Sequence, residues 1–315
     1  MTTIPDDLRI AVILPCFNEE IAISTTINGF RAALPTAEIY VYDNNSTDRT
    51  AEVARQCGAI VRAEAMQGKG NVVRRIFANV QADIYVMADG DATYDAASAP
   101  LLVSKLVSDQ LDMIVGSRVS DDTNAYRRGH QFGNVLLTSI LAFIFGRTFN
   151  DILSGYRVFS YRFVKSFPVI SSGFEIETEM SVHALELRMA VAEVSIPYAA
   201  RPDGSESKLS TYRDGFRILR MITTLFRVEK PFLFFGTIGV FLALVSVSIS
   251  IPLAITYAQT GLVPRFPTAI LAMGLIIISV LCLFAGLILD TVVRGRLEMR
   301  RLFYLSIPPP NCISP

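Results

Sequence analysis

The chain has 315 residues, a formal net charge of zero, 51% hydrophobic residues and only 18% charged residues. Its mean hydropathy of +0.41 is high for a soluble protein and predicts a membrane segment. Zero net charge excludes an overall field that would recruit nucleic acid, so we expect no nucleic-acid partner.

The cysteines and histidines narrow the metal chemistry. The four cysteines lie far apart without Cys-x-x-Cys spacing, and only two histidines are present. We therefore expect neither a zinc site nor a disulfide framework. A metal would be held by carboxylates, which favours Mg²⁺ or Mn²⁺. Ile10–Leu14 is too short for the apolar core of a signal peptide, so we expect the N-terminal part to stay in the cytoplasm.

Short apolar runs alternate with helical patterns from Arg9 to about Ser117. The predicted strands are Ile10–Leu14, Ile39–Tyr42, Ala59–Arg62, Ile84–Ala88 and Met113–Val115. The predicted helices are Glu20–Ala33, with Asn18 as its N-cap, Asp48–Cys57, Gly70–Asn79 and Ala97–Ser108. This alternation predicts an α/β fold with a doubly wound, mostly parallel sheet, which binds ligands at the carboxyl ends of its strands.

The sequence between Arg118 and Lys208 is less regular. Asn134–Phe145 is apolar but, at about 12 residues, too short to span a bilayer, so it is either a core helix or an interfacial one. Ile176–Leu187 has the pattern of a helix, and Val191–Ile196 has that of a strand.

Two uncharged apolar runs, Phe232–Tyr257 and Thr268–Leu289, lie near the end of the chain. Each is long enough to cross a bilayer, and two such neighbouring runs are rare in soluble cores, which is the alternative reading. Basic residues precede the first run and follow the second, whereas the short loop between them carries only Arg265. This asymmetry predicts an integral, multi-pass membrane protein with both termini in the cytoplasm.

Leu209–Val228 repeats apolar residues at helical spacing, with arginines on or beside the opposite face. The pattern predicts an amphipathic helix that lies either on an anionic membrane surface or on the preceding domain. We therefore divide the chain into a cytoplasmic domain (1–208), a juxtamembrane helix (209–230), a transmembrane hairpin (231–290) and a basic cytoplasmic tail (291–315).

The tripeptide Asp89-Gly90-Asp91 directly follows the fourth predicted strand, so it lies in a strand-end loop. Two carboxylates that flank a glycine can turn toward one point and hold Mg²⁺ or Mn²⁺ against a diphosphate. By itself such a tripeptide is more often a surface turn.

Three further polar loops favour a functional role for Asp89-Gly90-Asp91 over a surface turn. They are Pro15–Glu20, Asp43–Asp48 and Gln67–Asn71. Each alone is typical of a helix cap or a turn. Together they place polar and glycine residues at successive strand ends of one sheet, where Lys69 and Gly70 can approach phosphates through charge and backbone N–H groups.

The motifs Pro-x-x-Asn-Glu, Asp-Asn-Asn-Ser-Thr-Asp, Gly-Lys-Gly, Asp-Gly-Asp and Gly-Ser-Arg occur in this order. As a set they resemble family 2 inverting glycosyltransferases with a GT-A fold. Asp151–Arg157, Phe174–Glu179 and Arg201–Leu209 look like dolichol-phosphate mannose synthase and bacterial polyprenyl-phosphate glycosyltransferases. The resemblance covers roughly residues 9–230, and the two-helix tail matches bacterial and archaeal members.

The resemblance implies transfer of a sugar, with inversion, from a nucleotide sugar to undecaprenyl or dolichyl phosphate at the cytoplasmic membrane face. The implied nucleotide-binding residues are Pro15, Phe17, Glu19, Asp43, Asn44, Lys69, Asp89 and Lys208. The implied metal ligands are Asp89 and Asp91, and the implied acceptor-phosphate residues are Arg118, Arg127, Arg128 and Arg157. The implied catalytic residues are Asp89, Asp91, Asp151 and Arg118. The bacterial relatives favour UDP over GDP, and a homo-oligomer is compatible with the sequence.

A phosphate acceptor is already anionic near neutral pH, so its site needs a metal and arginines more than it needs a base. We expect Asp151 and Glu177 to orient the acceptor phosphate region or its arginines, with Asp151 as a base only if the acceptor is a hydroxyl. Asn44, Thr93 and Phe17 depart from the family pattern, which leaves the nucleobase and the sugar open.

Other functions find less support. A processive polysaccharide synthase would carry Gln-x-x-Arg-Trp, and the chain has no tryptophan. An NAD site would place G-x-G-x-x-G after the first strand, where it is missing. Two alternatives stay open: a glycosyltransferase that acts on a lipid or glycan hydroxyl, and a catalytically silent membrane scaffold that binds sugar nucleotides.

Overall fold

The computed structural model describes residues 8–119, 149–173, 175–199 and 226–308, together with residues 139, 142, 220, 223 and 224. Its strands are β1 (Ile10–Cys16), β2 (Glu38–Asp43), β3 (Ile60–Ala63), β4 (Ile84–Met87), β5 (Met113–Val119), β6 (Arg157–Ser160) and β7 (Val191–Pro197). Its helices are α1 (Ile23–Ala33), α2 (Thr50–Gln56), α3 (Lys69–Asn79), the 3₁₀ turn η1 (Ala96–Ser98), α4 (Ala99–Ser108), α6 (Tyr161–Ser166), α7 (Ile176–Glu186), α9 (Pro231–Thr260) and α10 (Phe266–Ser306). The described residues fall into two compact units, one drawn from residues 1–218 and 300–315 and the other from 219–299.

The seven strands form one sheet in the order β3-β2-β1-β4-β6-β5-β7. β1 pairs in parallel with β2 and β4, β2 pairs in parallel with β3, and β5 pairs in parallel with β7. Only β6 runs against its neighbours, β4 and β5. The carboxyl ends of the six parallel strands and the start of β6 therefore meet at one edge. The doubly wound, mostly parallel sheet expected from the sequence is confirmed.

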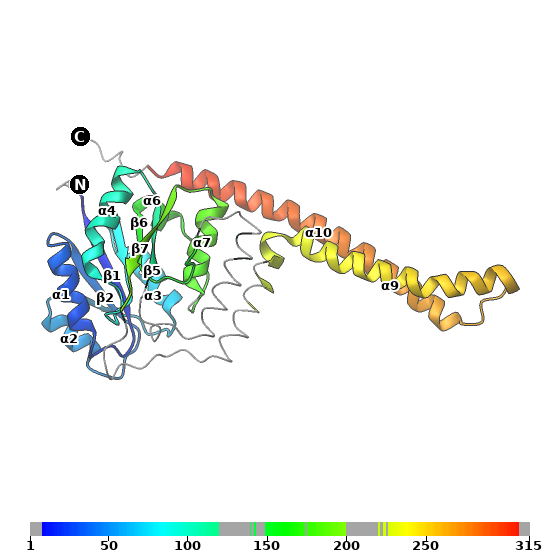
Figure 1. Ribbon diagram of the computed structural model, residues 1–315, viewed down its shortest axis with the longest axis horizontal. Helices are drawn as coiled ribbons and strands as arrows, with labels where there is room; N and C mark the ends of the chain where they lie inside the picture. The colour runs from blue at the N-terminus through cyan, green and yellow to red at the C-terminus, as the bar shows by residue number, and fades with distance from the viewer. Residues whose placement is uncertain are drawn as a thin grey trace. The chain divides into compact units, whose positions relative to one another are not determined.

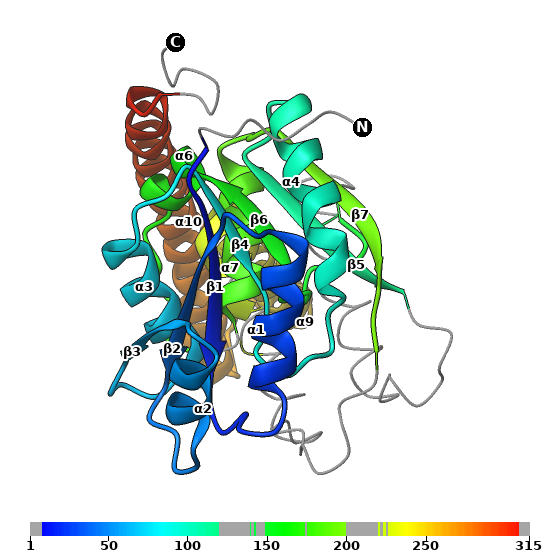
Figure 2. The same cartoon turned by 90° about the vertical axis from the view of Figure 1, so that its left-hand side faces the viewer.

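Helices cover both faces of the sheet (Figure 2). α1, α2 and α4 lie on one face, where Ile27 and Leu102 join Val12 in an apolar core. α3, α6 and α7 lie on the other face, where Phe77 packs edge-on against Tyr85. Because both faces are buried, the strands appear in the sequence as continuous apolar runs rather than as alternating patterns.

The predicted boundaries are close to the observed ones, with two differences. α1 begins at Ile23 rather than at Glu20, and Asn18 is not its N-cap: Asn18 has φ +54° and its Oδ1 accepts from the backbone N of Thr47 at 2.8 Å. β6 was not predicted, because a four-residue run that begins with a buried arginine lacks a strand signature. The apolar run Asn134–Phe145 and most of Leu209–Val228 lie outside the described residues.

α9 and α10 run side by side as a helical hairpin (Figure 1). Small residues line their contact: Ser246 Oγ donates to Ala272 O at 2.7 Å, and Ser279 Oγ donates to Gly239 O at 2.7 Å. Small residues and buried hydroxyl groups of this kind hold helices together in lipid.

Both hairpin helices are long and apolar enough to cross a bilayer, with mean hydropathies of 2.4 and 2.8. Only 17% of the most apolar window of each helix is buried. A core helix of a soluble protein would be mostly buried, so these helices indicate association with a membrane.

His183 of α7 is buried against Phe163 and Phe167, and its Nδ1 lacks a hydrogen-bond partner among the described residues. Burial, with a smaller contribution from Arg300, lowers the pKa of His183 to about 3. Below the unfolded pKa of about 6.5, the unfolded chain binds a proton that the folded chain does not. The stability that is present above this pH is therefore lost as the pH falls toward 3, by at most about 1.4 kcal/mol per pH unit.

We expect His183→Leu to flatten this dependence, because leucine fills the apolar site without titrating. Thermal melting of the full chain in detergent at a series of pH values between about 6.5 and 4 measures the effect. The wild-type Tm should fall more steeply than that of the variant. Parallel curves would mean that another group carries the acid sensitivity.

Candidate active site

Loops at the carboxyl edge of the sheet carry the predicted nucleotide-binding residues. Pro15 lies on β1, Phe17 and Glu19 follow it, and Asp43 ends β2. Asp43 Oδ2 accepts from the backbone N of Ser46 at 3.3 Å, but Oδ1 is buried without a hydrogen-bond partner among the residues described. An unsatisfied buried oxygen is costly unless a ligand completes it. Asp43 is therefore placed to accept a hydrogen bond from a ligand.

Asn44 shapes the neighbouring loop. Its Nδ2 donates to Glu64 O at 3.0 Å and to Met66 O at 2.8 Å, and its Oδ1 accepts from the backbone N of Gly68 at 2.7 Å. These bonds fix the entry into α3, which begins at Lys69. Asn44 thus supports the loop that precedes α3, and its direct contact with a nucleotide stays a prediction.

Lys69 lies between two carboxylates. Its Nζ pairs with Asp89 Oδ1 and lies 2.5 Å from Glu177 Oε1, with only 7% of the side chain exposed. Burial opposes the ammonium charge, but Asp89 and Glu177 outweigh burial and raise the pKa of Lys69 above its usual value. Gly155 permits this arrangement, because a Cβ there would collide with Asp89 and would lie 3.1 Å from Lys69 Nζ. A fixed positive charge therefore stands beside Asp89, and Glu177 holds this lysine rather than an arginine.

Asp91 is 3% exposed, and its Oδ1 accepts from the backbone N of Thr93 at 3.2 Å and from its Oγ1 at 2.6 Å. Ala92, with φ +59°, adopts the left-handed conformation that turns the chain back for these bonds. Among the described residues, no group of three or more His, Cys, Asp or Glu side chains could hold a metal by itself. The carboxylates of Asp89 and Asp91 fit an ion that takes its other ligands from a substrate diphosphate and water, as Mg²⁺ does.

Gly90 lies close to Cys16, and a Cβ on Gly90 would collide with Cys16 Sγ and lie 3.3 Å from Ile23 Cδ1. We expect Gly90→Ala to displace the loop that holds Asp89 and Asp91, because overpacking of this kind costs about 1–3 kcal/mol. The sequence resemblance implies that this loop holds a cation and a nucleoside diphosphate, so calorimetry should show that the variant binds UDP at least about tenfold more weakly than the wild type in the presence of Mn²⁺. Cys16→Ala should bind as the wild type does, and the double variant should recover most of the affinity. A double variant that stays weak would contradict the steric explanation.

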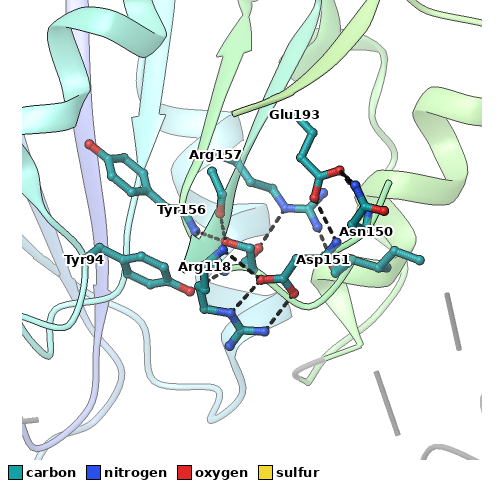
Figure 3. Close-up of polar contacts among 11 residues, drawn as sticks. Tyr94, Arg118, Asn150, Asp151, Tyr156, Arg157 and Glu193 are labelled. Carbon is teal, nitrogen blue, oxygen red and sulfur yellow. Dashed lines mark hydrogen bonds and ion pairs between the residues drawn. The ribbon is translucent and has the colours of Figure 1, made fainter. Parts of the chain in front are cut away.

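Arg118, near the end of β5, forms a two-pronged ion pair with Asp151 (Figure 3). Its Nε and Nη2 donate to Asp151 at 2.7 and 2.8 Å. Glu193 of β7 holds the Asp151 loop by accepting from the backbone N of Asp151 at 2.9 Å and from that of Asn150 at 2.8 Å. Burial opposes the charge of Arg118, but Asp151 raises its pKa above the usual value. The result is an oriented guanidinium of the kind that binds phosphate.

Arg157 opens β6 and is wholly buried beneath this pair. Its Nη2 donates to Ile152 O at 2.6 Å, its Nε to Ser154 O at 3.0 Å and its Nη1 to Ser181 Oγ at 2.9 Å. Burial lowers the pKa of Arg157 to about 10, although Glu177 and other carboxylates act in the opposite direction. Arg157 supports the loop that carries Asp151, and the expected contact with an acceptor phosphate would require it to leave the interior.

Some site residues were not found by sequence reasoning. Tyr94 accepts from the backbone N of Gly155 at 2.8 Å, and its ring packs against Tyr198, over which the Arg118 guanidinium lies 5.5 Å from the ring centroid. Glu193, in the middle of β7, reaches the site only because β7 pairs with β5. No motif marks these residues, although Tyr94 follows Asp91 closely in the chain. The predicted residues Arg127, Arg128 and Lys208 lie outside the described residues.

Comparisons with known proteins bear on this site. Residues 11–167 match the family model described as Glycosyl transferase family 2. Glycosyltransferase AglJ of Haloferax volcanii is 32% identical over 304 residues, which cover 95% of this chain and 98% of that protein. Dolichyl-phosphate hexose transferase of the same organism is 28% identical over 226 residues, which cover 71% and 96%.

A crystal structure of glucosyl-3-phosphoglycerate synthase from Mycobacterium tuberculosis, in complex with Mn²⁺, UDP and glucosyl-3-phosphoglycerate, is also similar. It matches with a TM-score of 0.58 and 24% identity over 70% of this chain and 79% of that chain. At this identity the match shows a shared fold and no more.

Proposed function

This chain belongs to glycosyl transferase family 2, and from that premise we propose that it transfers a sugar from a nucleoside diphosphate sugar to a polyprenyl phosphate. The proposal places the reaction at the cytoplasmic face of a membrane, with inversion at the anomeric carbon. One observation supports the proposal. Arg118, whose oriented guanidinium can bind a phosphate, lies at the same edge of the sheet as Asp89 and Asp91, and the chain also has two long apolar helices.

The acceptor is argued from solubility and charge. A polyprenyl chain leaves a bilayer only at about 0.8 kcal/mol per buried CH₂, so its enzyme has to work at the membrane, as the hairpin allows. A polyprenyl phosphate is an anion, which suits Arg118 oriented by Asp151. A relative named dolichyl-phosphate hexose transferase supports the same acceptor class.

The nucleoside diphosphate sugar is proposed as the donor because of the residues around Asp43, Lys69 and Asp89. Asp43 Oδ1 lacks a partner and can accept from a ribose or a base, and Lys69 lies beside Asp89, where a diphosphate would come. Asp89 and Asp91 would hold Mg²⁺ or Mn²⁺. The donor nucleotide in the proposal is UDP, which the structure with a similar fold contains together with Mn²⁺. The bound cation would neutralise charge on the diphosphate.

In the reaction, an anionic oxygen of the acceptor phosphate forms a bond to the anomeric carbon while the bond from that carbon to the nucleoside diphosphate breaks. No proton has to be removed from the acceptor, so no general base is needed. Arg118 would hold the attacking phosphate, and Lys69 would add positive charge near the departing diphosphate. Because two anions must approach each other, these fixed charges lower the barrier more than a base would.

The test uses the full chain in lipid nanodiscs with radiolabelled UDP-hexoses and GDP-hexoses in separate reactions. With a polyprenyl phosphate we expect label in an acid-labile, organic-extractable product for at least one donor. The matched control replaces the phosphate acceptor with the corresponding polyprenol. If every donor fails with the phosphate acceptor, the proposal is wrong.

A second candidate, transfer to a hydroxyl acceptor, is favoured by the position of Asp151 at the site edge, where a carboxylate could act as a base. In that case label should enter a polyprenol or glycan product, and Asp151→Asn should abolish it. Nucleotide binding without transfer to any acceptor would instead indicate the silent scaffold.

A further inference from the structure

The segment Arg300–Ser306, at the C-terminal end of α10, belongs to the same compact unit as the candidate active site. Tyr304 is buried, and its hydroxyl donates to Asp112 Oδ2 at 2.7 Å. The guanidinium of Arg162 lies 4.3 Å from the centroid of the Tyr304 ring. Arg300 Nη1 lies 2.9 Å from Glu186 Oε2. The C-terminal end of α10 thus packs into the compact unit that holds residues 1–218.

The Asp112 carboxylate explains why this contact is built in. Asp112 is completely buried, so each of its oxygens needs hydrogen-bond donors. Oδ1 accepts from Ser160 Oγ at 3.0 Å and from Arg162 Nε at 3.0 Å, and Oδ2 accepts from Arg162 Nη2 at 2.9 Å and from Tyr304. The Tyr304 side chain therefore supplies both a donor to the buried carboxylate and a ring against the half-buried Arg162 guanidinium.

The partners of Tyr304 and Arg300, Asp112 and Glu186, each lie at one end of an element whose other end carries a site residue. Asp112 immediately precedes β5, and β5 ends with Arg118 and Val119 at the edge of the site. Glu186 is the last residue of α7, and the first turn of α7 carries Glu177, which holds Lys69. Helices and strands transmit position along their length because their backbone hydrogen bonds make them stiff.

We propose that Tyr304 and Arg300 are positioning residues for the reaction. Tyr304 fixes β5, and through it Arg118 on the acceptor side. Arg300 fixes α7, and through it the Glu177–Lys69–Asp89 cluster on the donor side. The catalytic unit is thus completed by residues from the C-terminal end of α10. The assignment of Arg118 to the acceptor and of the Glu177–Lys69–Asp89 cluster to the donor rests on the proposed function. The inference that Tyr304 and Arg300 fix β5 and α7 does not.

The structural part is tested by hydrogen exchange and mass spectrometry on the full chain in detergent. Tyr304→Phe keeps the ring and removes only the hydroxyl, and Arg300→Gln removes only the ion pair. We expect exchange to rise about tenfold in peptides from β5 for the first variant and in peptides from α7 for the second. Arg301→Gln is the matched control, since it removes one charge from an exposed neighbour, and it should change neither. Unchanged exchange in both test variants, or an equal rise across the whole unit, would overturn the proposal.

The functional consequence is tested by measuring KM for the nucleotide sugar and KM for the acceptor separately in each variant. Arg300→Gln should raise KM for the nucleotide sugar severalfold with little change in KM for the acceptor, and Arg300→Lys should restore most of the loss. Tyr304→Phe should show the reverse split. Equal effects on both substrates would indicate general loosening and contradict positioning. A wild-type chain that transfers no sugar would reject the proposed function, while the exchange result would still decide the positioning.

Discussion

Asp91→Asn is expected to lower kcat/KM for sugar transfer by about 10²–10³-fold, the loss typical of removing one electrostatic contact to a transition state. Asparagine keeps the size of the side chain and an oxygen that can accept from Thr93 at the observed 3.2 and 2.6 Å, so the loop should keep its shape. What is lost is the negative charge that would hold the cation. Initial rates over a Mn²⁺ titration measure the effect, and the cation concentration needed for half-maximal rate should rise.

Asp109→Asn is the matched control, because it removes an exposed carboxylate at the end of α4 that pairs, among the described residues, with Lys105 and Ser108 of its own helix. Its kinetics and cation dependence should equal those of the wild type. If Asp91→Asn retained full metal-dependent transfer, Asp91 would not be a metal ligand, and the assignment of the Asp89–Asp91 pair would fail with it.

Arg118→Lys is expected to lower kcat/KM for a polyprenyl phosphate by about 10–100-fold, although the positive charge is kept. Lysine cannot reproduce the two parallel bonds that Nε and Nη2 make to Asp151, so the charge loses its fixed direction. KM for the nucleotide sugar should change little. Arg31→Lys, on the exposed part of α1, is the control and should leave both parameters unchanged.

Arg118→Gln separates catalysis from stability. It removes the ion pair between Arg118 and the buried Asp151 carboxylate, so we expect a lower Tm as well as lost activity. The double variant Arg118→Gln/Asp151→Asn removes both charges and should regain much of the Tm without regaining transfer. A double variant that regains activity would show that Arg118 acts only through the fold.

Much of the fold could be predicted because neighbouring residues in the sequence already show which segments are buried and which are polar loops. β1, β2, β4 and β5 are buried on both faces and therefore appear as apolar runs, and polar loops follow them at the edge where parallel strands end. The site could be located at this edge for the same reason. Asn18 was mistaken for a cap because a polar residue before a helix has the same composition in a cap and in a tight loop.

Most partners of the site residues could not be predicted in this way. Asp89 and Asp91 were expected to hold a metal, but the structure also places Lys69 against Asp89 and pairs it with Glu177. Arg157 was expected beside the acceptor, but its side chain is wholly buried and donates to Ile152 O, Ser154 O and Ser181 Oγ. Both outcomes depend on contacts between residues that lie far apart in the sequence.

By itself the sequence determined the α/β alternation, the polar strand-end loops and the two apolar helices, because burial and hydropathy act on neighbouring residues. Only the tertiary structure decided that Lys69 bridges two carboxylates, which of the arginines Asp151 pairs with, and that Tyr304 donates to Asp112. Each of these contacts joins buried charged or polar groups from distant parts of the chain. Burying a charge is favourable only where a partner meets it, and that meeting is a property of the folded chain.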